Sequence, residues 1–160
     1  MEQKMEVIYE DEQILICYKP AGLATQTSSI VQEDMVSQVK NYRKGKGEDP
    51  YVGVVHRLDQ PVEGLLAFAK TPRAADLLGK QLRFHQIRAQ LAARNAPIVG
   101  DAKYGGTATG RPLCLCAYRL IFRHPATGEE VEFAIRPRGE DFRDFTSLPR
   151  LIPMQPDTRR

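Results

Sequence analysis

Residues 54–66 read VVHRLDQPVEGLL and join two apolar runs through a charged loop. The runs are typical of buried strands, while Pro61 stiffens the loop between them and Gly64 gives it conformational freedom. Burying a charge is costly unless the charge is paired, so we expect Arg57 and Asp59 to have a functional role. A carboxylate held beside a guanidinium is a minimal unit for nucleophilic or acid–base chemistry on an anionic polymer.

The composition of the chain is that expected for one soluble globular domain over residues 1–160. Hydrophobic residues make up 42% of the chain and charged residues 27%, and the length allows one sizeable core. The net charge of +3 permits a nucleic-acid partner without requiring one. The start of the chain is polar, and no apolar run approaches the ~20 residues that span a bilayer. We therefore expect a cytoplasmic protein without a membrane partner.

The three cysteines favour packing over disulfide or metal chemistry. Cys17, Cys114 and Cys116 are an odd set, which suits a reducing compartment. Cys114 and Cys116 alternate in a strand-like run and should point to one face. They lack a second pair of ligands, so the sequence predicts no metal site.

The pattern along the chain predicts an α+β fold, in which a mixed, mainly antiparallel sheet has flanking helices. Alternating apolar residues predict a strand over residues 5–10, and further strand-like runs predict a strand over 13–19, a strand–loop–strand over about 52–70, a long strand over 113–122 and its hairpin partner over 131–135. Helical spacing predicts helices over residues 32–43, after Thr71 and Pro72, and around 87–92. Glu33 and Asp34 are expected in the first turn of the first helix.

Several ordered blocks resemble the RluA-type pseudouridine synthases, which isomerise uridine in RNA. The matching blocks are IYED at 8–11, KPAG at 19–22, HRLD at 56–59 with GLL at 64–66, RFHQIRAQLA at 83–92, PIVGD at 97–101, YG at 104–105, and the strand over 113–122 with HP at 124–125. The resemblance implies one catalytic domain of the pseudouridine synthase fold, without a separate RNA-binding domain. It also implies ribosomal or transfer RNA as the partner and no cofactor.

The chain departs from the family pattern between Gln81 and Arg83. In the family, a substantial segment at this place contributes central strands and a Lys-x-Tyr motif whose Tyr packs on the target base. Here, the preceding helix runs straight into the RFHQIR block. Either the protein carries an internal deletion, or the sequence itself omits residues. The resemblance therefore predicts an internally shortened version of the fold.

The resemblance assigns the chemistry to two residues. Asp59 would be the catalytic carboxylate, kept ionised while shielded from water, and Arg88 would be the cation that forms a fork with it. Arg57 would lie at the mouth of the pocket, where it fills the place of an extruded base or grips a phosphate. The predicted substrate-binding residues are Arg57, His56, Arg83, His85, Ile87 and Tyr104. Tyr104 is the aromatic residue available to compensate for the absent Tyr.

Each assignment has a plainer alternative. Asp59 could pair with Arg57 inside the loop, and Arg88 could be a surface residue of its helix. His56 and His85 suit structural hydrogen bonds better than acid–base roles. Lys19 and Lys103 could contact phosphate, or they could be ordinary solvated lysines. A basic patch of helix residues either steers RNA or is only a solvated face, and its members are Lys40, Arg43, Lys44 and Lys46.

Three function classes follow from these readings. The first is an RNA pseudouridine synthase, or a descendant of one. The second is a noncatalytic RNA-binding remnant that keeps the basic rim of the pocket. The third is a fragment that folds by strand exchange into a homodimer, because a missing central segment would leave sheet edges exposed.

Overall fold

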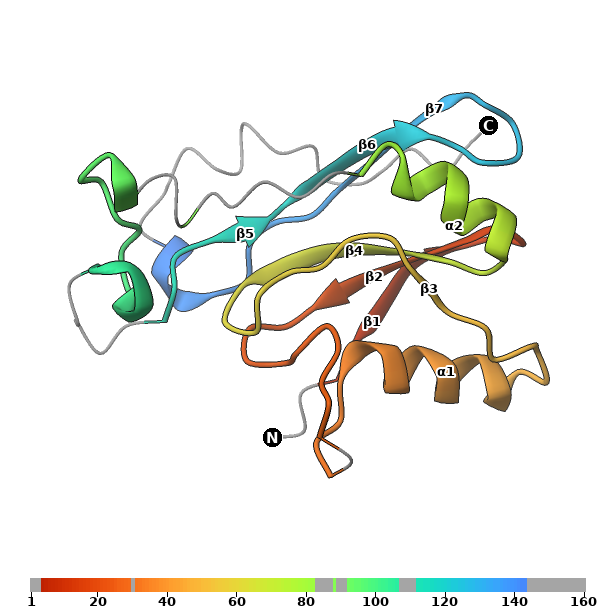
Figure 1. The fold of residues 1–160 in the computed structure, drawn as a ribbon, viewed down its shortest axis with the longest axis horizontal. Coiled ribbons are helices and arrows are strands. Elements are labelled where there is room, and N and C mark those ends of the chain that lie inside the picture. Colours follow the sequence, from red (N-terminus) through yellow and green to blue (C-terminus); the bar gives the residue numbers. More distant parts are fainter. Residues whose placement is uncertain (1–3, 30, 83–87, 89–91, 107–111, 144–160) are drawn as a thin grey trace.

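A computed structural model describes residues 4–29, 31–82, 88, 92–106 and 112–143, and Figure 1 shows their arrangement. The described chain is a mixed α+β structure, as the sequence predicts. Its elements, in chain order, are β1 (Glu6–Glu10), β2 (Ile14–Lys19), α1 (Met35–Gly45), β3 (Gly53–Val54), β4 (Glu63–Ala69), α2 (Pro72–Gly79), the 3-10 turn η1 (Ala102–Tyr104), β5 (Cys116–Ala117), β6 (Arg119–Arg123), β7 (Glu130–Ala134) and the 3-10 turn η2 (Glu140–Phe142).

The main sheet is built around β4. Its path is β1-β2-β4-β3, with every pair antiparallel, and β2 pairs with β4 along its whole length, from Ile14 opposite Ala69 to Lys19 opposite Gly64. On the other edge of β4, β3 pairs with the C-terminal end and β5 pairs in parallel with the N-terminal end. The loops that follow β2 and precede β4 therefore meet at one end of the sheet.

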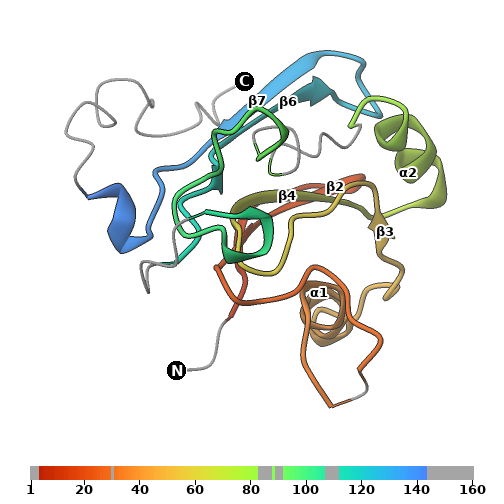
Figure 2. The ribbon, with the colours of Figure 1, turned by 60° about the vertical axis from the view of Figure 1, so that its left-hand side comes forward.

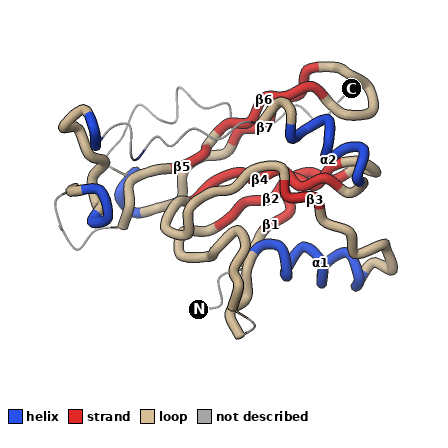
Figure 3. Tube along the Cα trace, viewed as in Figure 1, coloured by secondary structure: helices blue, strands red, loops and turns tan. Residues whose placement is uncertain are grey.

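Alternation along β2 and β4 gives the sheet two apolar faces. Leu15 and Cys17 point to the face that α1 covers, where they meet Met35 and Val39. The opposite face is covered by α2 and by the β6–β7 hairpin. Figure 2 shows the sheet between these two layers, and Figure 3 shows one helix on each side of it. Because both faces are buried, β4 is a continuous apolar run after its first residue, Glu63, rather than an alternating one.

Helix α1 begins later than its apolar spacing predicts. Asp34 is not in the first turn but is the N-cap, and its side chain accepts a hydrogen bond from the backbone N–H of Ser37 at 2.7 Å. The Ser37 hydroxyl in turn accepts one from the Asp34 N–H, which completes a capping box. A short acidic side chain gains more by binding free N–H groups than by lying inside the turn. Helix α2 follows the prediction, with Thr71 as its N-cap and Pro72 as its first residue.

The long strand predicted over residues 113–122 is wrong, because the chain changes partner within it. Cys116 and Ala117 pair with the start of β4, and the following residues form β6, which pairs with β7. Gly64 makes the first pairing possible. It has φ +138°, and a Cβ added there would lie 2.6 Å from the backbone N and O of Ala117.

Candidate active site

Two loops meet at the end of the sheet where β2 ends and β4 begins: the N-terminal loop (residues 20–27) and the aspartate loop (residues 55–62). Lys19 fastens them together. Its Nζ is fully buried and donates to the carbonyl oxygens of Leu23 at 2.6 Å, Gln60 at 3.0 Å and Pro20 at 3.1 Å. Burial lowers the pKa of Lys19 to about 8, so the ammonium stays charged at neutral pH. Lys19 is therefore neither a solvated lysine nor available for phosphate.

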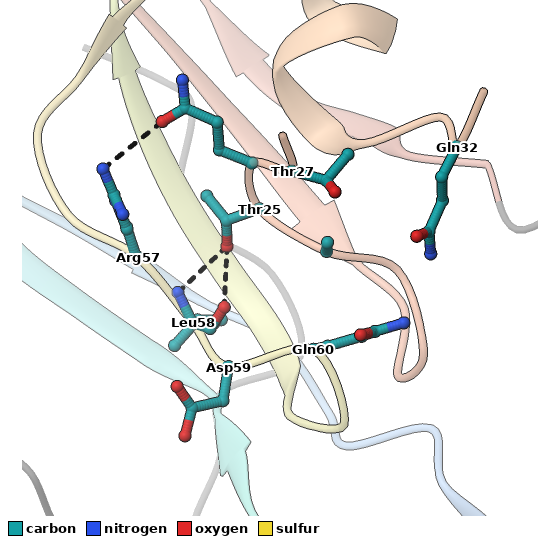
Figure 4. Close-up of a pocket in the computed structure, with 9 residues that line it drawn as sticks. Thr25, Thr27, Gln32, Arg57, Leu58, Asp59 and Gln60 are labelled. Carbon is teal, nitrogen blue, oxygen red and sulfur yellow. Dashed lines mark hydrogen bonds between the residues drawn. The ribbon is translucent and has the colours of Figure 1, made fainter. Parts of the chain in front are cut away.

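Further hydrogen bonds hold the residues on both sides of Asp59. The Thr25 hydroxyl accepts from the Leu58 N–H at 3.1 Å and donates to the Leu58 carbonyl at 2.8 Å, as Figure 4 shows. The Gln60 side chain donates to the carbonyl of Gly22 at 2.9 Å, and the Gly22 N–H donates to the Gln60 carbonyl at 2.8 Å. The backbone that carries Asp59 is thus positioned by residues far away in the sequence.

Asp59 pairs with Arg88 as predicted, but through one bond instead of the predicted fork, and it lacks the predicted shielding. Its Oδ2 accepts a hydrogen bond from Nη1 of Arg88 at 2.5 Å. The Asp59 side chain is 61% exposed, so the expectation of a carboxylate shielded from water is wrong within the described structure. The aspartate loop lies at the end of the sheet rather than inside it, which lets Arg57 and Asp59 avoid the cost of burial.

Arg88 is held more firmly by a residue that the sequence did not single out. Its Nε and Nη2 donate to the two carboxylate oxygens of Asp101, both at 2.8 Å, and the Asp101 side chain is fully buried. These hydrogen bonds lower the pKa of Asp101 and, together with the bond to Asp59, raise the pKa of Arg88. The PIVGD block contains Asp101, but nothing in its spacing identifies the partner.

Tyr104 lies beside this cluster. Its ring centroid is 5.2 Å from Cζ of Arg88 and 5.4 Å from Nζ of Lys103. The structure therefore brings three of the predicted site residues together: Asp59, Arg88 and Tyr104. Arg83, His85 and Ile87 lie outside the described residues.

A polar pocket of about 290 Å³ adjoins Asp59. It is lined by Ala24, Thr25, Gln26, Thr27, Gln32, Arg57, Leu58, Asp59 and Gln60. Arg57 forms one side of the pocket, where its Nη2 donates to Oε1 of Gln26 at 3.4 Å. Figure 4 shows the side chains of Arg57 and Asp59 pointing in different directions. The plain alternative of an Arg57–Asp59 pair is therefore wrong.

His56 faces the sheet. Its Nε2 accepts a hydrogen bond from the backbone N–H of Ala67 at 2.9 Å, in the stretch of β4 between the residues that pair with β3 and with β5. Burial lowers the pKa of His56 to about 4, so the ring is neutral and can accept this bond. The geometry favours the structural alternative for His56 over the predicted substrate contact.

The predicted basic patch is largely used inside the fold. Arg43 is buried and donates to the carbonyls of Tyr51 and Lys70, while Lys46 pairs with Glu10 at 2.8 Å and Glu48 at 3.3 Å. Only two members of the patch, Lys40 and Lys44, are exposed without an ion pair to another described residue. Arg43 is therefore not part of an exposed basic patch, and Lys46, although exposed, is already paired with two carboxylates.

No cluster of three His, Cys, Asp or Glu side chains suited to a metal ion occurs among the described residues. In the same part of the chain, no helix combines the length and the apolar character needed to cross a bilayer.

Comparisons with known proteins agree with the motif-based resemblance. A family model described as RNA pseudouridylate synthase matches residues 13–93, which include Asp59 and Arg88. The ribosomal large subunit pseudouridine synthase D of Xanthomonas campestris is 30% identical over 138 residues, or 86% of this chain and 38% of that protein. The tRNA pseudouridine synthase C of Yersinia pestis is 34% identical over 103 residues, or 64% of this chain and 38% of that protein.

The chain thus spans about two fifths of the length of these two relatives. Among solved structures, human RNA pseudouridylate synthase domain containing 4 superposes with a TM-score of 0.66 at 14% identity. The match covers 93% of this chain and 94% of that one, and it supports the fold. Because the family model matches half of the chain and includes its charged loop, the chain belongs to the RNA pseudouridylate synthase family, as its resemblance to the RluA-type enzymes predicts.

Proposed function

We propose that the protein isomerises uridine in RNA to pseudouridine, with Asp59 as the catalytic carboxylate and Arg88 as its partner. The observation that carries the proposal is the 2.5 Å ion pair between these two side chains, inside the span that matches the family. The pair joins an arginine and an aspartate 29 positions apart, at the end of the sheet where several loops converge.

The reaction needs no external reactant. The bond between C1′ of ribose and N1 of uracil breaks, the uracil turns, and C5 bonds to C1′. The proton leaves C5 and N1 gains one, so the product is an isomer of the substrate. A carboxylate suits this chemistry because it can act as a nucleophile or accept a proton without a metal or a cofactor.

The exposure of Asp59 sets a requirement on the substrate. A carboxylate that is 61% exposed is well solvated, and its electrostatic effect on a reacting sugar is weak in water. The bound nucleotide would therefore have to cover Asp59 and exclude water from it. A uridine in folded RNA must leave its stack to reach this position. In this proposal Arg57, which lines the adjoining pocket, would contact the RNA from which the nucleotide is extruded.

Release of tritium from RNA that contains 5-tritiated uridine tests the proposal. Transcripts of ribosomal and transfer RNA serve as substrates, because C5 loses its hydrogen only when isomerisation is completed. We expect release with the wild-type protein and none above background with Asp59→Asn, which keeps the shape of the side chain and removes its charge. Asp76→Asn is the matched control, because Asp76 on α2 is an exposed carboxylate that also has one cationic partner, Lys80. Turnover by Asp59→Asn would refute the assignment.

A noncatalytic RNA-binding protein is the second candidate, and the open position of Asp59 favours it. In that case the protein binds RNA with an affinity that falls as salt rises, because phosphate contacts release counterions. Tritium release by the wild-type protein would be absent under conditions in which the RNA is fully bound. Binding and tritium release measured on the same samples distinguish the two functions.

The remaining properties of the protein are part of the same proposal. RNA of the ribosomal or transfer class is the partner, since relatives named for both substrates match the chain. We propose a cytoplasmic protein in which residues 1–160 form one catalytic domain. A homodimer formed through exposed sheet edges is the alternative assembly, and light scattering with and without RNA decides between monomer and dimer.

A further inference from the structure

We propose that Asp101 is a positioning residue, which holds Arg88 fixed so that Asp59 can leave its ion pair for the substrate while the guanidinium stays in place. This inference rests on the proposed function, because it assigns a role within that site. It adds a second carboxylate, outside the residues that match the family model, to the pair already described.

The contacts of Arg88 are divided unequally between the two carboxylates. Asp101 accepts from Nε and Nη2 in a parallel, two-bond fork, which fixes both the position and the plane of the guanidinium. Asp59 accepts one bond, from Nη1. A single contact does not determine the orientation of a planar group, so the orientation of Arg88 is set by Asp101.

Burial divides the two carboxylates in the same way. The Asp101 side chain is fully buried, whereas that of Asp59 is 61% exposed. A buried carboxylate that loses its cation is left without solvation, so the Asp101–Arg88 pair resists dissociation. An exposed ion pair is weak because water replaces either partner. A substrate can therefore displace Arg88 from Asp59 far more easily than it can displace Arg88 from Asp101.

The backbone around Asp101 is itself held rigidly. The Asp101 N–H donates to the carbonyl of Ile98 at 3.0 Å, and the Asp101 carbonyl accepts from Tyr104 at 3.2 Å and Gly106 at 2.8 Å. A Cβ at Gly106 would lie 2.5 Å from the Ile98 oxygen, so the turn closes tightly around the aspartate. The Tyr104 ring packs near the guanidinium and limits its movement from another side.

With Arg88 fixed, Asp59 gains freedom to act. Its Oδ1 has no hydrogen bond to another described residue. Two carboxylates share the Arg88 guanidinium, and Asp101 takes two of its three bonds, so Arg88 neutralises Asp59 only in part. A carboxylate that is not fully neutralised remains a competent nucleophile or base when the substrate excludes water.

Kinetics of Asp101→Asn provide the first test. The amide keeps the volume of the side chain but can accept only one of the two bonds from Arg88, so we expect kcat for tritium release to fall by about 10²-fold. We expect KM for RNA to change by less than about threefold, because Asp101 is buried and does not reach the substrate. Asp76→Asn should match the wild type in both parameters. A kcat within threefold of wild type in folded Asp101→Asn would overturn the proposal.

A second measurement does not depend on activity. In protein labelled with 15N-arginine, the Nε–H of Arg88 should exchange slowly with water, because it donates to a buried carboxylate. The signal is assigned by its loss in Arg88→Lys. We expect it to persist in Asp59→Asn and to disappear or broaden in Asp101→Asn. Loss of the slow exchange in folded Asp59→Asn would show that Asp59 is the anchor, and it would overturn the proposal even if Asp101→Asn does not fold.

Tritium release and the exchange of the Arg88 Nε–H together distinguish failure of the proposed function from failure of the role assigned to Asp101. If the wild-type protein releases no tritium, the proposed function fails, and the exchange of the Arg88 Nε–H still decides whether Asp101 holds the guanidinium. If the wild type is active and Asp101→Asn is equally active with slow exchange intact, the proposed function stands and the role of Asp101 fails.

Discussion

Fully or partly buried polar side chains in this protein bind backbone groups that have no partner within a strand pairing. Lys19 gathers three loop carbonyls, and His56 accepts the N–H of Ala67 in a stretch of β4 that lies between the pairings of its two short neighbours. Backbone groups buried without partners are costly, so these side chains stabilise the loops that carry Asp59. At this scale, residues that look like candidates for RNA contact serve to build the site.

The neutral state of His56 predicts a pH dependence of stability. Burial lowers the pKa of His56 from 6.5 to about 4, so between these values the unfolded chain binds a proton that the folded chain does not. The contribution is complete above pH 6.5 and is lost as the pH falls towards 4. The loss at pH 5 is about 2 kcal/mol. Urea unfolding at pH 7 and pH 5 measures it.

His56→Gln is the matching variant for this prediction. Glutamine can still offer an oxygen to the Ala67 N–H but does not titrate in this range. We expect the free energy of unfolding of His56→Gln to fall less between pH 7 and pH 5 than that of the wild type, by about 2 kcal/mol. All other titrating groups are common to both proteins. If the free energies of unfolding of the two proteins fell equally between pH 7 and pH 5, a His56 that stays neutral in the folded protein would be contradicted.

Among the described strands, β4 has the most partners. It pairs with β2 from Gly64 to Ala69 and with two short strands on its other edge, and its first residues contact β5 through Gly64. This is also the end of the sheet that the aspartate loop enters. Changes in the β4–β5 contact should therefore affect both stability and the position of Asp59.

Gly64→Ala tests that contact. The methyl group would meet the Ala117 backbone at 2.6 Å, and φ of +138° is unfavourable for alanine, so we expect a loss of about 2–4 kcal/mol in the free energy of urea unfolding. Gly79→Ala is the matched control. Nothing lies within 4 Å of a Cβ at Gly79, the last residue of α2, so alanine should be neutral or stabilising by up to ~1 kcal/mol. Equal stabilities of the two variants would contradict the tight β4–β5 approach.

On the scale of the whole molecule, three kinds of contact join the β6–β7 hairpin to the rest of the fold. The Phe133 ring packs against Tyr9 of β1, with ring centroids 5.1 Å apart, and against Phe122 of the same hairpin at 5.9 Å. Asp11, in the β1–β2 turn, bonds His124 at 2.8 Å. Gln81 exchanges two hydrogen bonds with the backbone of Arg123. The hairpin is thus part of the same core as the sheet.

Phe133→Ala tests whether the hairpin and the main sheet unfold together. Phe133 is buried, so its truncation should cost about 3–5 kcal/mol. Because the hairpin and the sheet share one core, circular dichroism and tyrosine fluorescence should report the same lowered urea midpoint. Ile121→Ala, on the same hairpin but 41% exposed, should change stability by less than about 1 kcal/mol. Separate transitions for the two probes would show that the hairpin is an independent unit.

The elements that the sequence predicts well are those defined by short-range patterns. Strand-like apolar runs identify β1, β2 and the hairpin, and Thr71 with Pro72 marks the start of α2. The prediction of secondary structure fails where a residue or strand can bind either of two partners in the fold. Asp34 caps α1 instead of joining it, and the run over residues 113–122 divides between two sheets. Both outcomes depend on the binding partner, which is the free N–H of Ser37 for Asp34 and the strands β4 and β7 for residues 113–122, and local propensity does not identify that partner.

Periodicity, capping residues and motifs, all of which are patterns among neighbouring residues, were sufficient to predict the α+β elements, the membership of the family and the candidate pair of Asp59 and Arg88. The packing of distant segments was needed to show that Asp59 is exposed, that Lys19 is fully buried and His56 partly buried, and that Asp101 binds Arg88. Burial and ion pairing depend on distances between segments far apart in the chain. Those distances are set by the packing of the sheet against its two layers, and no single segment encodes them.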